Sequence, residues 1–164
     1  MTIRLASEKD IAAIRAVALA TWPVAYASIL SPAQMSYMLE LMYAEHALKK
    51  QMTRSGHRFL VAEKDKLITG FVSFETGHKG RNIARLHKLY VTPITQGTGT
   101  GKALLAFSIN AARSAGDTVL ELNVNKHNKA KDFYLHHGFT VVRDEVIDIG
   151  QGFAMDDHVL QRVL

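Results

Sequence analysis

The chain has 164 residues, of which 48% are hydrophobic and 21% are charged, so a disordered, collagen-like or low-complexity protein is excluded. It contains no cysteine, which excludes disulfides, thiolate metal sites and cysteine nucleophiles and fits a reducing, cytoplasmic compartment. The formal net charge is +5 at pH 7, and the segment between Glu75 and Asp117 contains basic residues but no acid. Such a segment suggests an anionic partner, but from charge alone a solvated basic face is the favoured interpretation.

The first half of the chain predicts one strand, three helices and two further strands. Residues 1–6 form the opening strand, and the helix after it is expected to end at Pro23, because proline lacks the N–H of a helix interior. Ser31, followed by Pro32 and then by Gln34, predicts the capped start of a second helix. The remaining elements expected here are a helix over residues 44–54 and strands over residues 59–62 and 67–74.

The second half alternates strands and helices. A long strand over residues 83–91 is stopped by Pro93, and a glycine-rich loop leads into a helix over residues 103–115. The later elements expected are a strand over residues 119–122, a helix over 128–137, a strand over 139–142 and a last strand within 153–164. Helices and strands that alternate around an antiparallel-rich sheet predict the α+β (mixed α/β) class, in a single domain of residues 1–164.

No charged residue lies between Ala16 and Leu39. Prolines and serines interrupt this stretch, so it predicts no membrane helix, and the N-terminus lacks the apolar core of a signal peptide. Trp22, Tyr26 and Tyr37 lie within it and offer apolar rings with polar tips. We interpret the stretch as an uncharged wall of a substrate site, with a buried helix and loop as the alternative.

The loop from Gln96 to Lys102 is the most informative segment, with the sequence Gln-Gly-Thr-Gly-Thr-Gly-Lys. Glycines allow positive φ and a close approach of backbone N–H groups to a ligand, and the helix that follows contributes the positive end of its dipole. The loop therefore predicts a phosphate cradle. The dinucleotide pattern G-x-G-x-x-G fails in both registers, and the nucleoside triphosphatase pattern fails because Ala103 follows the lysine.

Two motifs in this order carry a family resemblance. Gln96, Gly99 and Gly101 match the pattern Q/R-x-x-G-x-G/A, and the segment from Asn128 to Phe139 matches N-x-x-A-x-x-F-Y-x-x-x-G-F. The chain therefore resembles the GNAT superfamily of N-acetyltransferases over most of its length. Its helix layout and its ending are somewhat similar to bacterial spermidine/spermine N-acetyltransferases.

The resemblance implies a mostly antiparallel sheet flanked by helices, in which two splayed parallel strands form the acetyl-CoA site. The amide of Val91 would polarise the thioester carbonyl, and Asn128 would contact the pantetheine arm. Lys102, Lys126, Lys129 and Lys131 are candidates for the coenzyme phosphates, with a solvated surface as the equal alternative. The full set of expected coenzyme residues is Leu89, Tyr90, Val91, Gln96, Gly97, Thr98, Gly99, Thr100, Gly101, Lys102, Asn128 and Lys131.

The resemblance also implies the catalytic groups. Tyr134 matches the family's general acid, which protonates the departing thiolate. The family's usual base is a glutamate on the strand before the loop, but residues 86–89 contain no carboxylate, and His87 occupies the matching place. An ordinary histidine pKa near 6.5 suits proton removal at neutral pH, although a structural histidine is an equal alternative. No metal site is expected, because the other histidines show no ligand-like spacing.

The leading hypothesis is direct transfer of an acetyl group from acetyl-CoA to a small primary amine, with polyamines among the candidates. The expected partners are acetyl-CoA and that amine, without nucleic acid or membrane, and a homodimer is a family prior. Three alternatives stay open: a non-catalytic acyl-CoA sensor, an acetyltransferase of protein or peptide amines, and a nucleic-acid module that uses the basic segment.

Overall fold

A computed structural model describes residues 1–164 and has the α+β architecture that the sequence predicts. The strands follow the order β1-β2-β3-β4-β5-β7-β6, and β4 pairs with β5 in parallel. The strands are β1 (Thr2–Leu5), β2 (Arg58–Lys64), β3 (Leu67–Glu75), β4 (Ile83–Val91), β5 (Val119–Asn125), β6 (Thr140–Gly150) and β7 (Phe153–Val163). The helices are α1 (Ile11–Ala25), α2 (Pro32–Tyr43), α3 (Glu45–Thr53), α4 (Thr100–Ser114) and α5 (Ala130–His136).

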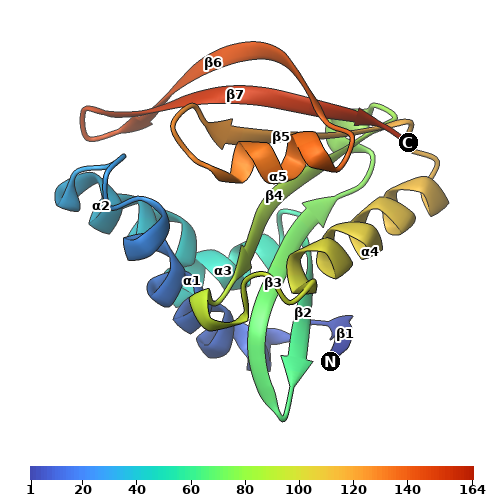
Figure 1. The fold of residues 1–164 in the computed structure, drawn as a ribbon, viewed down its shortest axis with the longest axis horizontal. Coiled ribbons are helices and arrows are strands. Elements are labelled where there is room, and N and C mark those ends of the chain that lie inside the picture. The colour runs from blue at the N-terminus through green and yellow to red at the C-terminus, as the bar shows by residue number, and fades with distance from the viewer. The chain divides into compact units, whose positions relative to one another are not determined.

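The chain forms two compact units, and both β4 and α4 contribute residues to each. The first unit comprises residues 1–75 and 86–110, which include the β2–β3 hairpin and helices α1 to α3. The second comprises residues 76–85 and 111–164, in which the long β6–β7 hairpin lies beside β5, with α5 packed on β5 (Figure 1). A single domain over the whole chain stays a prediction.

The core of the first unit is built from aromatic and aliphatic side chains of α1 to α3 and of the β2–β3 hairpin. Trp22 on α1 and Tyr43 on α2 are almost fully buried, and their ring centroids lie 5.7 Å apart. Tyr43 in turn meets Phe71 of β3 edge-to-face at 6.2 Å. Tyr43 and Phe71 also contact the ring of Tyr90 near the end of β4. This aromatic layer packs the helices on one face of β3 and of the later part of β4.

Two helix boundaries show how far local signals reach. The predicted end of α1 at Pro23 is wrong, because the helix continues to Ala25 and the Tyr26 amide still donates to the Trp22 carbonyl at 2.9 Å. The cost of proline is small there, since only one turn follows it and Leu19, whose carbonyl it leaves unmatched, lies on the exposed side. The predicted cap of α2 is confirmed, because the Ser31 hydroxyl accepts from the Gln34 amide at 3.1 Å.

The β2–β3 hairpin contains a β-bulge that changes which residues face each other. Asp65 and Lys66 form the turn with positive φ, and Glu63 pairs with Ile68. Ala62, however, pairs with Gly70, so one residue of β3 is left over between the two pairs. Beyond the bulge Arg58 pairs with Phe74, and the residue before Arg58 therefore lies opposite Glu75.

In the second unit β4 pairs with β5 from Ile83 opposite Val119 to Arg85 opposite Glu121. The strand predicted to start within residues 139–142 begins at Thr140 and continues to Gly150, and it pairs with β7 along this length. The charged residues in the middle of β6 hid this strand from pattern analysis, since they face solvent along an edge. None of the helices is long and apolar enough to span a membrane.

Candidate active site

The glycine-rich loop lies in the first unit, between the end of β4 and the start of α4. Gly97 and Gly99 have φ of +79° and +87°, and a Cβ at either position would meet no atom within 4 Å. Glycine is therefore required by the backbone conformation and not by lack of space. The Thr98 hydroxyl donates to the Thr95 carbonyl at 2.6 Å and lies 3.0 Å from the Thr100 hydroxyl, which fixes the loop between the two glycines.

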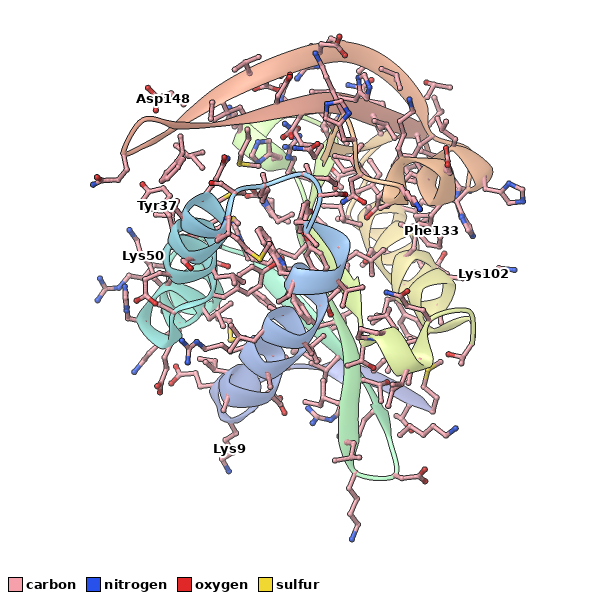
Figure 2. The ribbon with its side chains drawn as sticks, turned by 60° about the vertical axis from the view of Figure 1, so that its left-hand side comes forward. Lys9, Tyr37, Lys50, Lys102, Phe133 and Asp148 are labelled. Carbon is pink, nitrogen blue, oxygen red and sulfur yellow. The ribbon has the colours of Figure 1, made fainter.

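Helix α4 begins at Thr100, three residues earlier than predicted, so it starts inside the loop. The first N–H groups of a helix have no partner within the helix, and here they belong to Thr100, Gly101 and Lys102. The positive end of the dipole of a fifteen-residue helix lies at the same place. Lys102 is exposed and extends away from the helix (Figure 2). The loop and the helix start thus have the conformation and the charge to hold a diphosphate.

The end of β4 lies close to β3 and α4 because β3 has a glycine there. A Cβ on Gly70 would lie 3.0 Å from the Tyr90 carbonyl oxygen, 3.2 Å from Val91 Cγ2 and 3.3 Å from Leu104 Cδ1. Contacts this short are tighter than almost all Cβ contacts in proteins, so a side chain at this position would force its neighbours to shift. Gly70 therefore allows β3 and the first turns of α4 to pack directly on the part of β4 that is expected to bind the pantetheine arm.

The predicted substrate residues occupy different environments in the first unit. Trp22 is 2% exposed and Tyr26 is 8% exposed, so both rings lie mostly in the core, with their centroids 4.6 Å apart. A substrate contact by Trp22 stays a prediction. The Tyr26 hydroxyl lies 3.0 Å from the hydroxyl of Tyr90 on β4. Tyr37 is half-buried on α2 (Figure 2). Tyr26 and Tyr37 stay candidates for substrate contact.

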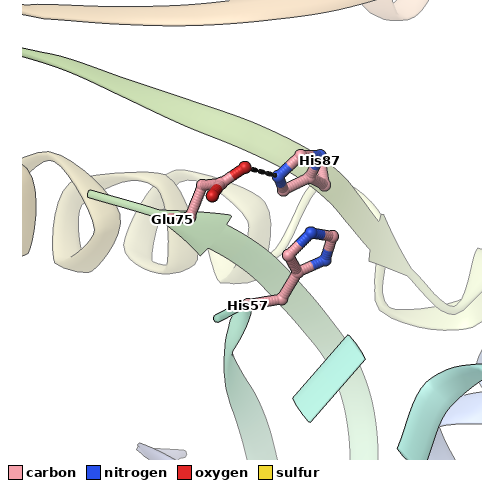
Figure 3. Close-up of side chains that lie close together, drawn as sticks. All are labelled: His57, Glu75 and His87. Atoms are coloured by element: carbon pink, nitrogen blue, oxygen red, sulfur yellow. Dashed lines mark hydrogen bonds and ion pairs between the residues drawn. The ribbon is translucent and has the colours of Figure 1, made fainter. Parts of the chain in front are cut away.

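His87 lies in the middle of β4 within a cluster that the sequence did not reveal. Its Nε2 atom is 2.8 Å from Glu75 Oε1 at the end of β3, and its ring stacks on His57 with centroids 3.9 Å apart and planes within 10° of parallel (Figure 3). Burial, together with His57 and Lys88 nearby, lowers the pKa of His87 to about 3, although the hydrogen bond to Glu75 acts in the opposite direction. The pKa of His87 is therefore shifted well below the ordinary value near 6.5, and its role as the base stays a prediction.

Glu75, at the end of β3, supplies a carboxylate next to His87, whereas β4 itself has none. The sequence places no carboxylate near His87 on β4, but the bulge in the β2–β3 hairpin places Glu75 opposite His57 and beside His87. The turn residues of the sequence predict that β2 and β3 pair. No sequence signal, however, predicts the bulge, which places Glu75 instead of Phe74 opposite His57. His57 has no ligand-like spacing in the sequence, and only the pairing of β2 with β3 brings it to His87.

Lys88 lies on the opposite face of β4 and is buried in the core. Its Nζ atom donates to Gln51 Oε1 at 2.7 Å and lies over the rings of Tyr43 and Phe59 at 5.5 and 5.8 Å. Burial lowers the pKa of Lys88 to about 8. In the second unit Arg85 pairs with Glu121 at 3.0 Å. Two of the six basic residues between Glu75 and Asp117 are therefore buried or paired and do not belong to a solvated basic face.

The lowered pKa of Lys88 predicts an increase in stability with pH. Between pH 8 and 10.5 the unfolded chain keeps this proton while the folded chain releases it, so the free energy of unfolding should rise. Relative to Lys88→Met, the native chain should gain roughly 3 kcal/mol over this interval. Urea unfolding of both proteins at each pH measures the difference, and Tyr43, which titrates above pH 10, affects both alike. Parallel pH profiles for the two proteins would contradict the buried charge.

The second unit holds the other predicted groups. Tyr134 on α5 is 7% exposed, and its ring packs edge-on against Phe133 and Phe139 at centroid distances of 5.3 and 5.5 Å. The Asn128 side-chain oxygen accepts from the amide of Ala130, the first residue of α5, at 2.9 Å. Lys126 pairs with Asp156 at 3.0 Å and with Asp144 at 3.6 Å, which weakens its candidacy for a coenzyme phosphate. Lys129 is exposed and Lys131 is half-buried.

Residues 27–154, more than half of the chain, match the family described as the acetyltransferase (GNAT) domain. The chain belongs to the GNAT acetyltransferase family. The L-amino acid N-acyltransferase MnaT of Escherichia coli is 33% identical over 106 residues, which are 62% of this chain and 60% of that protein. The L-methionine sulfoximine/L-methionine sulfone acetyltransferase of Salmonella typhimurium is 37% identical over 90 residues, which are 52% of each chain. This GNAT chain thus aligns with about half to three fifths of the length of these curated relatives.

Solved structures share the fold over the whole chain. The PaiA N-acetyltransferase of Thermoplasma acidophilum, solved with coenzyme A, has a TM-score of 0.81 at 23% identity, with both chains fully covered. YncA of Salmonella typhimurium, described as a putative acetyltransferase and solved with acetyl-CoA, has a TM-score of 0.67 at 28% identity and covers all of this chain and 94% of that one. The GNAT fold predicted by resemblance is therefore confirmed.

Proposed function

We propose that this GNAT chain transfers an acetyl group from acetyl-CoA to the amine of a small molecule, with the α-amino group of a free amino acid as the preferred acceptor. The observation that carries the proposal is the loop between β4 and α4, in which two exposed glycines with positive φ lead directly into the first backbone amides of the helix. This cradle suits the diphosphate of a coenzyme. The amino-acid class is supported by the names of the curated relatives.

The residues divide the work as follows. The amides from Gly97 to Lys102 hold the diphosphate, and the backbone of β4 from Leu89 to Val91 binds the pantetheine arm as an added strand would. The Val91 amide polarises the thioester carbonyl, an interaction that is worth about 3–4 kcal/mol in other enzymes. Tyr26 and Tyr37 contact the acceptor, while Asn128 and Lys131 contact the coenzyme.

Acetyl-CoA supplies an acyl group activated as a thioester. The amine nitrogen bonds to the acyl carbon as the carbon–sulfur bond breaks, and the two remaining proton transfers fall to this chain. His87 takes the proton that leaves the nitrogen, and Tyr134 gives its proton to the departing thiolate. His87 is neutral at pH 7, so its ring has a lone pair for the proton, and the carboxylate of Glu75, 2.8 Å from Nε2, stabilises the imidazolium that forms. The proton becomes far more acidic once its nitrogen bonds to carbon, which suits a weak base.

Two measurements test the function. Acetyl-CoA at about 100 times its Kd should stabilise the fold by about 2.7 kcal/mol and raise Tm, whereas NADH and ATP should not. Thiol release should then be measured with a panel of amines that contains neutral L-amino acids, methionine sulfone, spermidine and a peptide with a free N-terminus. Release should be strongest with the neutral L-amino acids or with methionine sulfone. Faster release with spermidine would move the acceptor class to polyamines. Coenzyme binding without release from any amine would favour an acyl-CoA sensor.

A further inference from the structure

Three side chains from separate strands meet in the first unit. His57 immediately precedes β2, Glu75 ends β3, and His87 lies in the middle of β4 (Figure 3). Their side chains are half-buried, and those of Glu75 and His87 are each 21% exposed. The bulge in β3 is what brings Glu75 to this position. We define these three residues as the His57–Glu75–His87 cluster.

The cluster has the composition of a metal site, but its geometry argues for another use. One ligand atom of each residue lies within 4.8 Å of the others. The two imidazole planes, however, are stacked within 10° of parallel. A metal ion lies in the plane of each ring that binds it, and one ion cannot lie in two parallel stacked planes. In this arrangement the two rings do not share an ion, whereas Glu75 and His87 already share a hydrogen bond.

A carboxylate beside one ring nitrogen of a histidine decides which nitrogen carries the hydrogen and which carries the lone pair. An ionised carboxylate only accepts hydrogen bonds, so the 2.8 Å contact requires the hydrogen of His87 to be on Nε2. The lone pair of the neutral ring then lies on Nδ1. When Nδ1 takes a proton, the negative charge of Glu75 stabilises the imidazolium, as the carboxylate does in serine protease triads.

His57 and Lys88 act against that charge. The charged and titratable groups that surround His87 are His57 before β2, Glu75 on β3 and Lys88 on β4 itself. His57 stacks on the ring face, and a second positive charge at 3.9 Å would repel the imidazolium. Burial, aided by repulsion from His57, keeps His87 unprotonated at rest, and Glu75 is the group that stabilises the ring once it takes a proton.

From this arrangement we infer that Glu75 is a positioning residue that fixes His87 as the Nε2–H tautomer, so that Nδ1 is the atom that accepts the substrate proton, and that His57 keeps the ring neutral before transfer. The inference rests on the proposed function for the substrate, but the tautomer itself does not depend on any substrate.

Nitrogen-15 NMR of the imidazoles tests the tautomer directly. The native chain should show His87 with its hydrogen on Nε2, and Glu75→Gln should show a population with the hydrogen on Nδ1, because an amide can donate as well as accept. A native His87 with its hydrogen on Nδ1 would overturn the inference. If the tautomer is as stated but no amine in the panel is acetylated, the proposed function fails and the role of Glu75 in fixing the ring stands.

Kinetics give the second readout. Glu75→Gln preserves the volume and a hydrogen bond, so a purely structural Glu75 would leave kcat near the native value, whereas a positioning role should lower kcat by about 10²-fold or more with the KM for acetyl-CoA unchanged. The matched control is Glu63→Gln on the same hairpin, whose carboxylate pairs with Arg4 at 2.9 Å. It should keep the native kcat. Equal values of kcat for the two variants would sink the inference.

The pH profile separates the part played by His57. His57→Phe keeps a ring on His87 but removes a titratable neighbour, so the acid limb of kcat/KM should move to higher pH. An acid limb that stays in place would remove His57 from the inference. Addition of EDTA should leave kcat unchanged, and loss of activity that zinc restores would replace the inference with a metal site.

Discussion

Tyr134→Phe is expected to lower kcat by about 10²- to 10⁴-fold while the affinity for acetyl-CoA stays near the native value. The substitution removes only the hydroxyl, so the proton that the departing thiolate needs no longer comes from the chain. Phenylalanine keeps the edge-on contacts with Phe133 and Phe139, at centroid distances of 5.3 and 5.5 Å, so α5 should keep its packing. Single-turnover thiol release and calorimetry with coenzyme A measure the two quantities separately.

Tyr43→Phe is the matched control for the loss of a buried phenol. Tyr43 is 1% exposed, and its ring packs between Trp22 and Phe71 in the core of the first unit. Its substitution should lower Tm and leave kcat unchanged, because the hydroxyl belongs to the core and not to the reaction. Full turnover by Tyr134→Phe would remove the assignment of Tyr134 as the acid, whatever the control does.

Substitution of both loop glycines, Gly97→Ala and Gly99→Ala, should weaken acetyl-CoA binding by about 10²-fold, since each alanine at positive φ costs about 1–2 kcal/mol. No neighbouring atom would meet the new methyl groups, so steric exclusion is not the cause. The strain is relieved when the loop changes its backbone, and the amides then no longer converge on the diphosphate. The loop is exposed, so Tm without ligand should change little. Calorimetry with coenzyme A measures the affinity.

Gly152→Ala offers the same conformational cost away from the loop. Gly152 has φ of +77° in the turn between β6 and β7, and a Cβ there would also meet nothing within 4 Å. This variant should bind coenzyme A as the native chain does. A double loop variant that bound equally well would show that the diphosphate is held elsewhere, and the proposed function would lose its main support.

The two substitutions probe separate parts of the proposal. The loop variant tests whether the chain grips a coenzyme, and Tyr134→Phe tests whether it completes a transfer. An enzyme would be supported if the loop variant lost coenzyme binding while Tyr134→Phe lost only turnover. An acyl-CoA sensor would be supported if the loop variant lost coenzyme binding but the native chain showed no measurable turnover.

The local elements of the fold followed from the order of residues along the chain. The strand over residues 83–91 was predicted with the bounds that β4 has in the structure. The alternate glycines of the loop indicated residues with positive φ, and Gly97 and Gly99 have positive φ in the structure. These features are decided by neighbours in sequence, because glycine, proline and capping side chains act on the backbone within one turn. The family motifs are local for the same reason.

What tertiary structure alone decided is which distant side chains meet. The sequence offered His87 with an ordinary pKa and no carboxylate, whereas the fold brings Glu75 and His57 to it and lowers its pKa by burial. One extra residue in β3 is responsible. The bulge shifts each pair between itself and the open end of the hairpin by one position, so that Glu75 instead of Phe74 lies opposite His57. Burial and register depend on the packing of the whole unit, so no pattern of neighbouring residues records them.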